Sequence, residues 1–313
     1  MGLVASVPET LRFTILILLA GLTASNSAAG QWMGKQTGCY AQSVTANPIA
    51  AHPNRPTVAN PADITQYGVL ELEYGWDRLW PEKGIQQTSI GGLLKLGMLC
   101  DVELRWNTTS LASQTDPSGT HGGFGDNWLG PQIRIYRQTT RVPTLALSYA
   151  VKIPSARAEN GLGTGRVDHE FTFLASKNIK RFHFDFNVTE FLIGRPDTFG
   201  FDRNEQMNVA FSHAIRGGLE VTGEVYKQTR LNHMTSGFVS SPWALTYTVL
   251  PRLVIDGGFE VEVTTGGPHR HASLVQRTRS PISMLHGESG RAVQLPSRAI
   301  LLSRRAGCSA NVP

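Results

Sequence analysis

Pro143-Thr-Leu-Ala-Leu-Ser-Tyr-Ala-Val-Lys-Ile-Pro154 is the stretch that decides the fold. Between its two prolines, large apolar residues alternate without a break with small or polar ones. The apolar set is Leu145, Leu147, Tyr149, Val151 and Ile153. Successive side chains of a strand point to opposite faces, so the alternation predicts a ten-residue strand with one apolar face. Ten residues is also about the length of a tilted strand that crosses a bilayer.

The same alternation recurs on both sides of this stretch, and no convincing helix follows the first 30 residues. Eleven strands are legible, near residues 68–77, 89–97, 102–107, 127–136, 144–153, 168–173, 182–189, 206–212, 219–225, 243–249 and 255–262. Most connections alternate between very short, as at 216–217, and long, as at 227–242. Tight turns at one end and long loops at the other are typical of outer-membrane barrels. The sequence therefore predicts an all-β fold, an antiparallel transmembrane β-barrel of about twelve strands whose last strand is missing or altered.

The polar faces of these strands carry charges, and a charge at the bilayer midplane costs about 2–4 kcal/mol for Arg or Lys. Several such groups facing lipid would exceed a typical folding stability, so the charged faces are expected to line the lumen and the apolar faces to meet lipid. Aromatic residues at strand ends are expected to form interfacial girdles; they are Trp76, Tyr136, Tyr149, Tyr226 and Trp243. The predicted lumen-lining residues are Glu71, Glu73, Asp101, Glu103, Arg105, Arg134, Lys152, Asp168, Glu170, His183, Asp185, Glu220 and Glu224.

Two interpretations of this mainly acidic wall stay open. It favours cationic or neutral polar permeants if the lumen is open. It forms a satisfied network of ion pairs and water if the barrel is narrow. A soluble all-β protein with the apolar faces in its core is the alternative to the membrane barrel as a whole.

Four segments are expected along the chain. Residues 1–29 resemble a signal peptide, because Arg12 precedes an apolar run from Phe13 to Leu22 and small residues follow. Residues 30–66, rich in proline and polar residues, predict an extended periplasmic leader. Residues 67–267 form the barrel, and residues 268–313 form an atypical tail.

The tail departs from the rest of the chain in composition. It holds seven Arg and no Lys, one Glu and no Asp, and no Phe, Tyr or Trp. A barrel without a closing strand leaves an unpaired edge in lipid, which is not tolerated. The hypothesis that follows is that residues 268–313 are an out-of-frame or replaced ending.

No cluster of residues predicts catalysis, a metal or a cofactor. His183 and Asp185 share a strand face and could form an acid–base dyad, but no motif supplies a nucleophile. The three cysteines and the histidines lack metal-ligand spacing. The net charge of +5 comes from the tail, which alone carries +6, so nucleic acid is not an expected partner.

Several ordered motifs in the barrel region resemble one family of bacterial outer-membrane barrels, the transporters named "putative meta-pathway of phenol degradation". They are Gly125–Pro131, Ala146–Tyr149, Lys152–Pro154, Gly163–Asp168 and Phe184–Asn187. The resemblance covers about residues 67–267 and implies a barrel of twelve strands that takes up small molecules passively, with aromatic or hydrophobic compounds as candidates. It implies no catalytic residues. The expected partners are outer-membrane lipid and a small-molecule permeant. The alternatives are a structural or partner-binding barrel with a plugged lumen and binding loops, and, third, an outer-membrane hydrolase.

Overall fold

The computed structural model describes residues 51, 54, 56–80, 84–160, 162–195, 198–230 and 237–264, and the backbone of 270–281. All of them belong to one compact unit. None of the helices in these ranges is long and apolar enough to cross a membrane. The elements are β1 (Val69–Leu79), β2 (Gln86–Leu99), β3 (Val102–Asp116), β4 (Gly119–Gly123), β5 (Asn127–Tyr136), β6 (Thr144–Ile153), η1 (Ala158–Asn160), β7 (His169–Ile179), β8 (Phe182–Gly194), β9 (Phe201–Arg216), β10 (Leu219–Gln228), β11 (Phe238–Leu250), β12 (Leu253–Glu262) and β13 (Arg270–Pro281).

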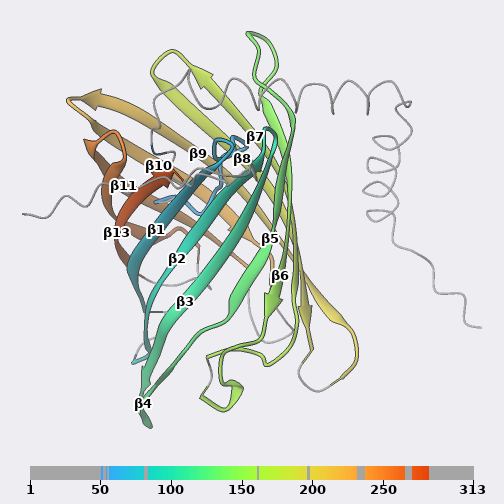
Figure 1. The fold of residues 1–313 in the computed structure, drawn as a ribbon. Helices are drawn as coiled ribbons and strands as arrows, with labels where there is room; N and C mark the ends of the chain where they lie inside the picture. The colour runs from blue at the N-terminus through green and yellow to red at the C-terminus, as the bar shows by residue number, and fades with distance from the viewer. Residues whose placement is uncertain are drawn as a thin grey trace, which may run out of the picture. The chain divides into compact units, whose positions relative to one another are not determined.

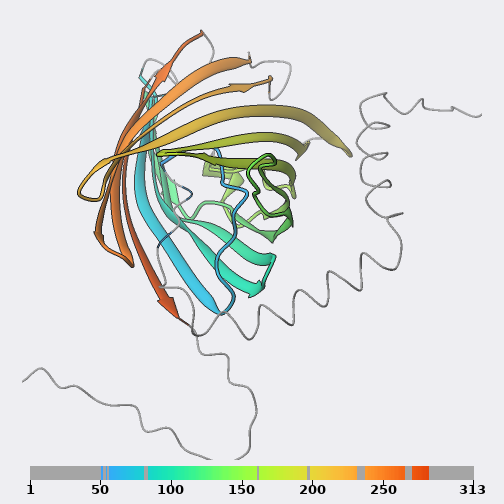
Figure 2. The same ribbon diagram turned by 90° about the horizontal axis from the view of Figure 1, so that it is seen from above.

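The strands form one closed antiparallel barrel (Figures 1 and 2). Thirteen strands make up the sheet, and because β4 pairs only with β3, the other twelve form the ring. Each ring strand pairs with its neighbour along the chain, and β13 closes the ring by pairing with both β12 and β1. The predicted all-β barrel of about twelve strands is confirmed.

The closing strand lies where the sequence predicted none. β13 falls within the segment 268–313 that was expected to be an atypical tail, and the barrel extends at least to Pro281. Of the two predicted possibilities, a missing or an altered last strand, the structure excludes the missing one. The register places Arg277 opposite Glu73 and Arg279 opposite Glu71 of β1. The out-of-frame hypothesis concerns residues 268–313. Of these, the structure describes only the backbone of 270–281.

The barrel has two different ends. Its turn end carries the tight connections at 100–101, 180–181, 217–218 and 251–252, together with 137–143, and its loop end carries the longer ones. At one of these two-residue turns, Gly217 and Gly218 have φ of 62° and 84°. Two consecutive residues with positive φ are typical of a type I′ turn between twisted strands, and glycine adopts that conformation without strain. The predicted alternation of short and long connections therefore arises because the short connections lie at the turn end and the long ones at the loop end.

One long connection is more ordered than expected. Between the strands predicted near 102–107 and 127–136, β3 continues to Asp116 and pairs with β4 as a hairpin beyond the ring. In the hairpin turn, Asp116 Oδ1 accepts hydrogen bonds from the backbone N–H and the hydroxyl of Ser118, which lower the pKa of the Asp116 carboxyl. Ser, Thr and Gly dominate this hairpin and leave no apolar alternation from which a strand could be predicted.

The distribution of side chains is opposite to that of a water-soluble protein. The largest fully buried side chains include Lys95, Glu71, Glu73, Glu103 and Gln132. The apolar residues of the strands point outward and are exposed, among them Leu147 and Ile153 of β6, Val209 of β9 and Val225 of β10. Because an exposed apolar band of this extent is unstable in water, the outer face suits the hydrocarbon core of a membrane.

A charge on this outer face is expected to be costly. Val209 lies near the middle of β9 and is 56% exposed on the outside. Substitution of Val209 by lysine is expected to lower the free energy of unfolding in lipid vesicles by about 2–4 kcal/mol, because the ammonium would enter hydrocarbon. The measurement is denaturant unfolding of vesicle-inserted protein.

The matched control is His121→Lys, on the exposed β3–β4 hairpin beyond the ring, which is expected to change stability by less than about 0.5 kcal/mol. Equal effects of the two lysines would contradict the placement of the outer face in hydrocarbon.

Candidate functional site

The predicted wall residues line the inside of the barrel at its middle and at both ends. Glu71, Glu73, Glu103, Lys152 and Glu224 are each at most 5% exposed. Glu170, Glu220 and His183 are partly exposed on the same inner face, and Asp185 is buried there. Asp101 and Asp168 lie just outside the strands, at the turn end and the loop end respectively. One predicted girdle residue is wrong: Tyr226 points into the lumen, where its hydroxyl donates to Glu260 Oε1 at 2.5 Å.

Residues before β1 run through the lumen as what we call the crossing segment, described at 54 and 56–66 (Figure 2). Ala51 lies at the turn end, where its N–H donates to the carbonyl of Pro251. The segment returns to the same end, where the Gly68 N–H donates to the carbonyl of Gly97. In between it touches side chains of β1, β2, β3, β5, β6, β7, β8 and β10. The prediction of an extended periplasmic leader at 30–66 did not include this placement inside the barrel. Proline-rich sequence without apolar periodicity is compatible with extended chain either outside or inside a polar barrel.

The wall holds this segment chiefly by its backbone. Carboxylate, amide and hydroxyl oxygens of the wall accept hydrogen bonds from backbone N–H groups, which replaces the strand pairing that an isolated extended chain lacks. The pairs are Asn54 to Glu73 (2.9 Å), Val58 to Glu224 (2.7 Å), Ala59 to Glu224 (2.9 Å), Asn60 to Asn187 (2.6 Å), Ala62 to Ser176 (2.7 Å) and Thr65 to Glu103 (2.6 Å). Glu73, Glu103 and Glu224 thus serve as acceptors for the crossing segment rather than only as surface charge.

Two asparagines give the segment side-chain contacts at its centre. Asn54 Oδ1 accepts from Lys95 Nζ at 2.7 Å, and Asn54 Nδ2 donates to Asn60 Oδ1. Asn60 Oδ1 also accepts from Arg105 Nη2 at 2.9 Å. Lys95 in turn bridges Glu71 and Glu73 at 3.5 and 2.8 Å. A central polar network therefore links the segment to three strands.

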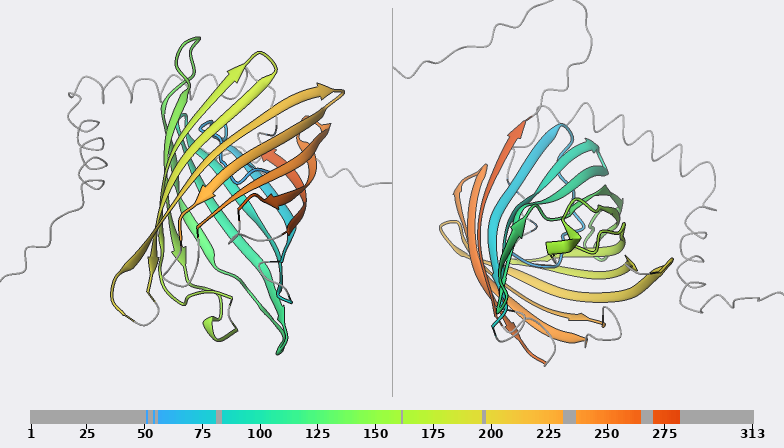
Figure 3. Two further views of the ribbon diagram at one scale, coloured as in Figure 1. Left: turned by 180° about the vertical axis from the view of Figure 1, so that it is seen from behind. Right: turned by 90° about the horizontal axis from the view of Figure 1, so that it is seen from below.

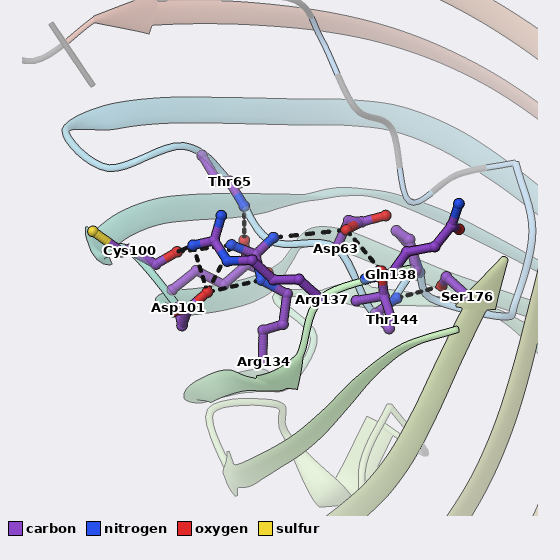
Figure 4. A network of polar contacts seen from close by, with 12 residues as sticks. Asp63, Thr65, Cys100, Asp101, Arg134, Arg137, Gln138, Thr144 and Ser176 are labelled. Atoms are coloured by element: carbon purple, nitrogen blue, oxygen red, sulfur yellow. Dashed lines mark hydrogen bonds and ion pairs between the residues drawn. The ribbon is translucent and has the colours of Figure 1, made fainter. Parts of the chain in front are cut away.

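A second network holds the segment at the turn end (Figure 4). Asp63 lies 3.6 Å from Arg134 Nη1 and accepts a hydrogen bond from the Thr144 hydroxyl. Arg134 and Arg137 both reach Asp101 Oδ1, at 2.8 and 2.7 Å. Two predicted wall residues, Asp101 and Arg134, are thus brought together, and they fasten the segment to the β2–β3 turn.

At the loop end, Lys152 ties a long loop to the barrel. Its ammonium contacts Asp168, lies 3.4 Å from Asp126 Oδ2 and donates to Thr164 Oγ1 at 2.8 Å. Asp168 also accepts from the Gly194 N–H. Residues 154–160 and 162–168 of this loop, with η1, lie within the outline of the barrel mouth in the view from below (Figure 3, right). Lys152 and Asp168 therefore position a loop over the mouth.

The predicted pair of His183 and Asp185 forms, with Nε2 3.0 Å from Asp185 Oδ1. The Ser176 hydroxyl donates to the same Asp185 oxygen at 2.5 Å and accepts the Ala62 N–H. A nucleophile would need its hydroxyl on the histidine rather than on the carboxylate. Within the described ranges, no three His, Cys, Asp or Glu side chains are grouped so as to hold a metal ion.

A cavity of about 340 Å³ lies between the crossing segment and the wall. The segment contributes residues 54 and 56–58 and Asn60, and the wall contributes residues of β1, β2, β3, β5, β6 and β7. Along β7, Ser176 holds the crossing segment near the turn end while Glu170 lines the cavity six positions nearer the loop end. The cavity therefore opens on the loop-end side of the segment.

Comparisons with known proteins agree with this architecture. The family model described as "Putative MetA-pathway of phenol degradation" matches residues 42–271. The crystal structure of the COG4313 outer membrane channel from Pseudomonas putida F1 has a TM-score of 0.55 and 12% identity, covering 76% of this chain and all of that one. The NanC porin has a TM-score of 0.47 and 9% identity, covering 67% of this chain and 98% of that one. No curated protein matches the sequence.

Proposed function

We propose a function from one premise: the chain belongs to the phenol-degradation family whose model matches most of its length. On this basis the protein is an outer-membrane channel for passive uptake of small molecules, with aromatic or hydrophobic compounds as candidate permeants. The observation that carries the proposal is the inverted side-chain distribution of a closed barrel, apolar outside and charged inside. The turn end then faces the periplasm and the loop end the exterior.

The proposed path leads from the loop-end mouth into the cavity and past the crossing segment. Two of the predicted lumen-lining residues, Arg105 and Glu170, contribute to the wall of the cavity on this path. Because the crossing segment fills the centre, we expect a narrow pore with small conductance rather than the large steps of an open porin. The proposal includes no catalysed reaction, since among the described residues the two ring nitrogens of His183 are bonded to Asn178 and Asp185 and not to a hydroxyl.

A second function from another class is favoured by the crossing segment itself. Its six backbone hydrogen bonds to the wall suit a permanently plugged barrel that displays binding loops. In that case the loops, not the lumen, would carry the function.

Solute flux separates the two proposals. Refolded protein in planar bilayers is expected to give discrete conductance steps, and proteoliposomes are expected to swell in solutions of small uncharged solutes. Heat-dependent migration on gels verifies that the barrel is folded in the same samples. Folded protein with neither current nor swelling would contradict the channel and support the plugged barrel.

A further inference from the structure

The carboxylates of the barrel wall differ in the number of cations and N–H donors that contact them. Glu71 and Glu73 contact Lys95, Glu103 lies 3.8 Å from Arg105 Nε, and Glu224 accepts three N–H groups. Such contacts offset the cost of removing a carboxylate from water. They also occupy the oxygens that a permeant would otherwise meet. These residues are therefore committed to the structure of the barrel and its crossing segment.

Glu170 is the exception that lines the cavity. Its carboxylate accepts one hydrogen bond, from the Thr172 hydroxyl at 3.2 Å, and makes no ion pair among the described residues. Arg105 attracts it electrostatically, but the Arg105 guanidinium is bonded to Gln132 at 2.7 Å and to Asn60 at 2.9 Å. A carboxylate that lines a cavity of mixed polar and apolar surface is stabilised by a cation that can reach it.

The other groups around the cavity suit an organic cation. Trp128 lines it with an indole ring, the aromatic side chain that attracts cations most strongly. Asn107 and Ser148 add side-chain oxygens that can accept N–H or O–H donors. Asp77 adds a second carboxylate. The cavity volume lies at the lower end of the roughly 300–1,000 Å³ of small-molecule sites.

We propose that this cavity binds small organic ammonium ions that carry an aromatic ring, with Glu170 accepting an N–H group of the ammonium and Trp128 contacting the ligand. An anionic ligand would have to share Arg105, which already donates to Asn60 and Gln132, and it would face the carboxylates of Glu170 and Asp77. Electrostatics therefore selects the positive partner. This inference rests on the proposed channel function and specifies a class of molecule that binds inside the channel. Ligand binding itself does not require that the pore conducts.

Three probes of nearly equal shape test the charge requirement: 2-phenylethylammonium, neutral 2-phenylethanol and anionic 3-phenylpropionate. Each is titrated calorimetrically into folded full-length protein in a non-ionic detergent. We expect 2-phenylethylammonium to bind at least about tenfold more tightly than either of the others, since one charge-assisted contact distinguishes them. Equal or tighter binding of 3-phenylpropionate would overturn the proposal.

Variants then locate the site. Glu170→Gln keeps the shape of the side chain and is expected to weaken binding of the ammonium at least about tenfold, while Glu170→Asp retains part of it. Trp128→Leu is expected to weaken all three probes, and the ammonium most. The control is Glu190→Gln, a carboxylate on the outer face of β8 paired with Arg203 at 3.0 Å, which should bind like the parent.

Unchanged binding in folded Glu170→Gln protein would place the ligand elsewhere and overturn the assignment. Because binding is measured in solution and flux in bilayers, failure of this site and failure of the channel give different results. Conductance without binding of the ammonium would contradict only the proposed binding site. Binding without conductance would contradict only the proposed channel function.

Discussion

Replacement of Glu224 by alanine is expected to convert brief, small channel openings into long-lived, large ones. Glu224 accepts the backbone N–H groups of Val58 and Ala59 and is 2% exposed. Hydrogen bonds to a charged group contribute about 1.5–3 kcal/mol each, so loss of both weakens the seated state of the crossing segment by about 3 kcal/mol or more. That corresponds to roughly a hundredfold rise in the ratio of channels whose crossing segment is displaced to channels whose segment is seated. Single-channel recording in planar bilayers measures it directly.

Two further variants make this result specific. Glu224→Gln retains an acceptor oxygen and should open the channel far less. Glu190→Gln removes a carboxylate from the outer face and should leave the current unchanged. If Glu224→Ala conducts like the parent while its barrel remains folded, then Glu224 does not hold the segment in place.

The largest loss of stability is expected from Lys95→Met. Lys95 is 2% exposed and lies against Glu71 and Glu73, which are both fully buried. Removal of one partner from a buried ion pair typically costs about 3–5 kcal/mol, because the remaining charge is still out of water. Methionine preserves most of the side-chain volume, so the loss reflects charge and hydrogen bonding rather than a cavity. Denaturant unfolding from lipid vesicles gives the free energy.

A lysine at the barrel rim provides the comparison. Lys177 donates to the carbonyls of Thr139 and Thr140 in an exposed connection, and Lys177→Met should cost less than about 1 kcal/mol. Adding Glu73→Gln to Lys95→Met should recover part of the lost stability, because one buried charge disappears. Equal stability of the two single lysine variants would refute a structural role for Lys95.

Much of the barrel could be predicted because its outer face obeys a simple rule. Leu145 to Ile153 alternate since every second residue meets lipid, and the same rule located eleven strands. It failed for β13, whose register against β1 sets Ser280, Thr278 and Gln276 opposite Leu70, Leu72 and Tyr74. A strand with few large apolar residues on either face carries no signal in its own sequence and is specified by its neighbours.

The inner face is harder to predict because polar residues there satisfy each other in three dimensions. The parity of β10 could have placed Tyr226 in the lumen with Glu224, and that signal was overridden by the preference of tyrosine for membrane interfaces. Lys95 could likewise have been read as lumen-facing from its position between Leu94 and Leu96. By contrast, nothing local in residues 54–66 indicates that their N–H groups find acceptors on strands more than a hundred residues away.

The crossing segment is held chiefly by its backbone, while its side chains border the passage, so the contacts that hold it do not determine the width of the passage. Val58 donates its N–H to Glu224, yet its side chain is 38% exposed and borders the cavity. Every amino acid except proline offers the same N–H, so position 58 could carry a different side chain without losing its bond to the wall. Substitutions at position 58, from a small polar side chain such as threonine to a large aromatic one such as tryptophan, would then change the width and polarity of the passage without changing the barrel.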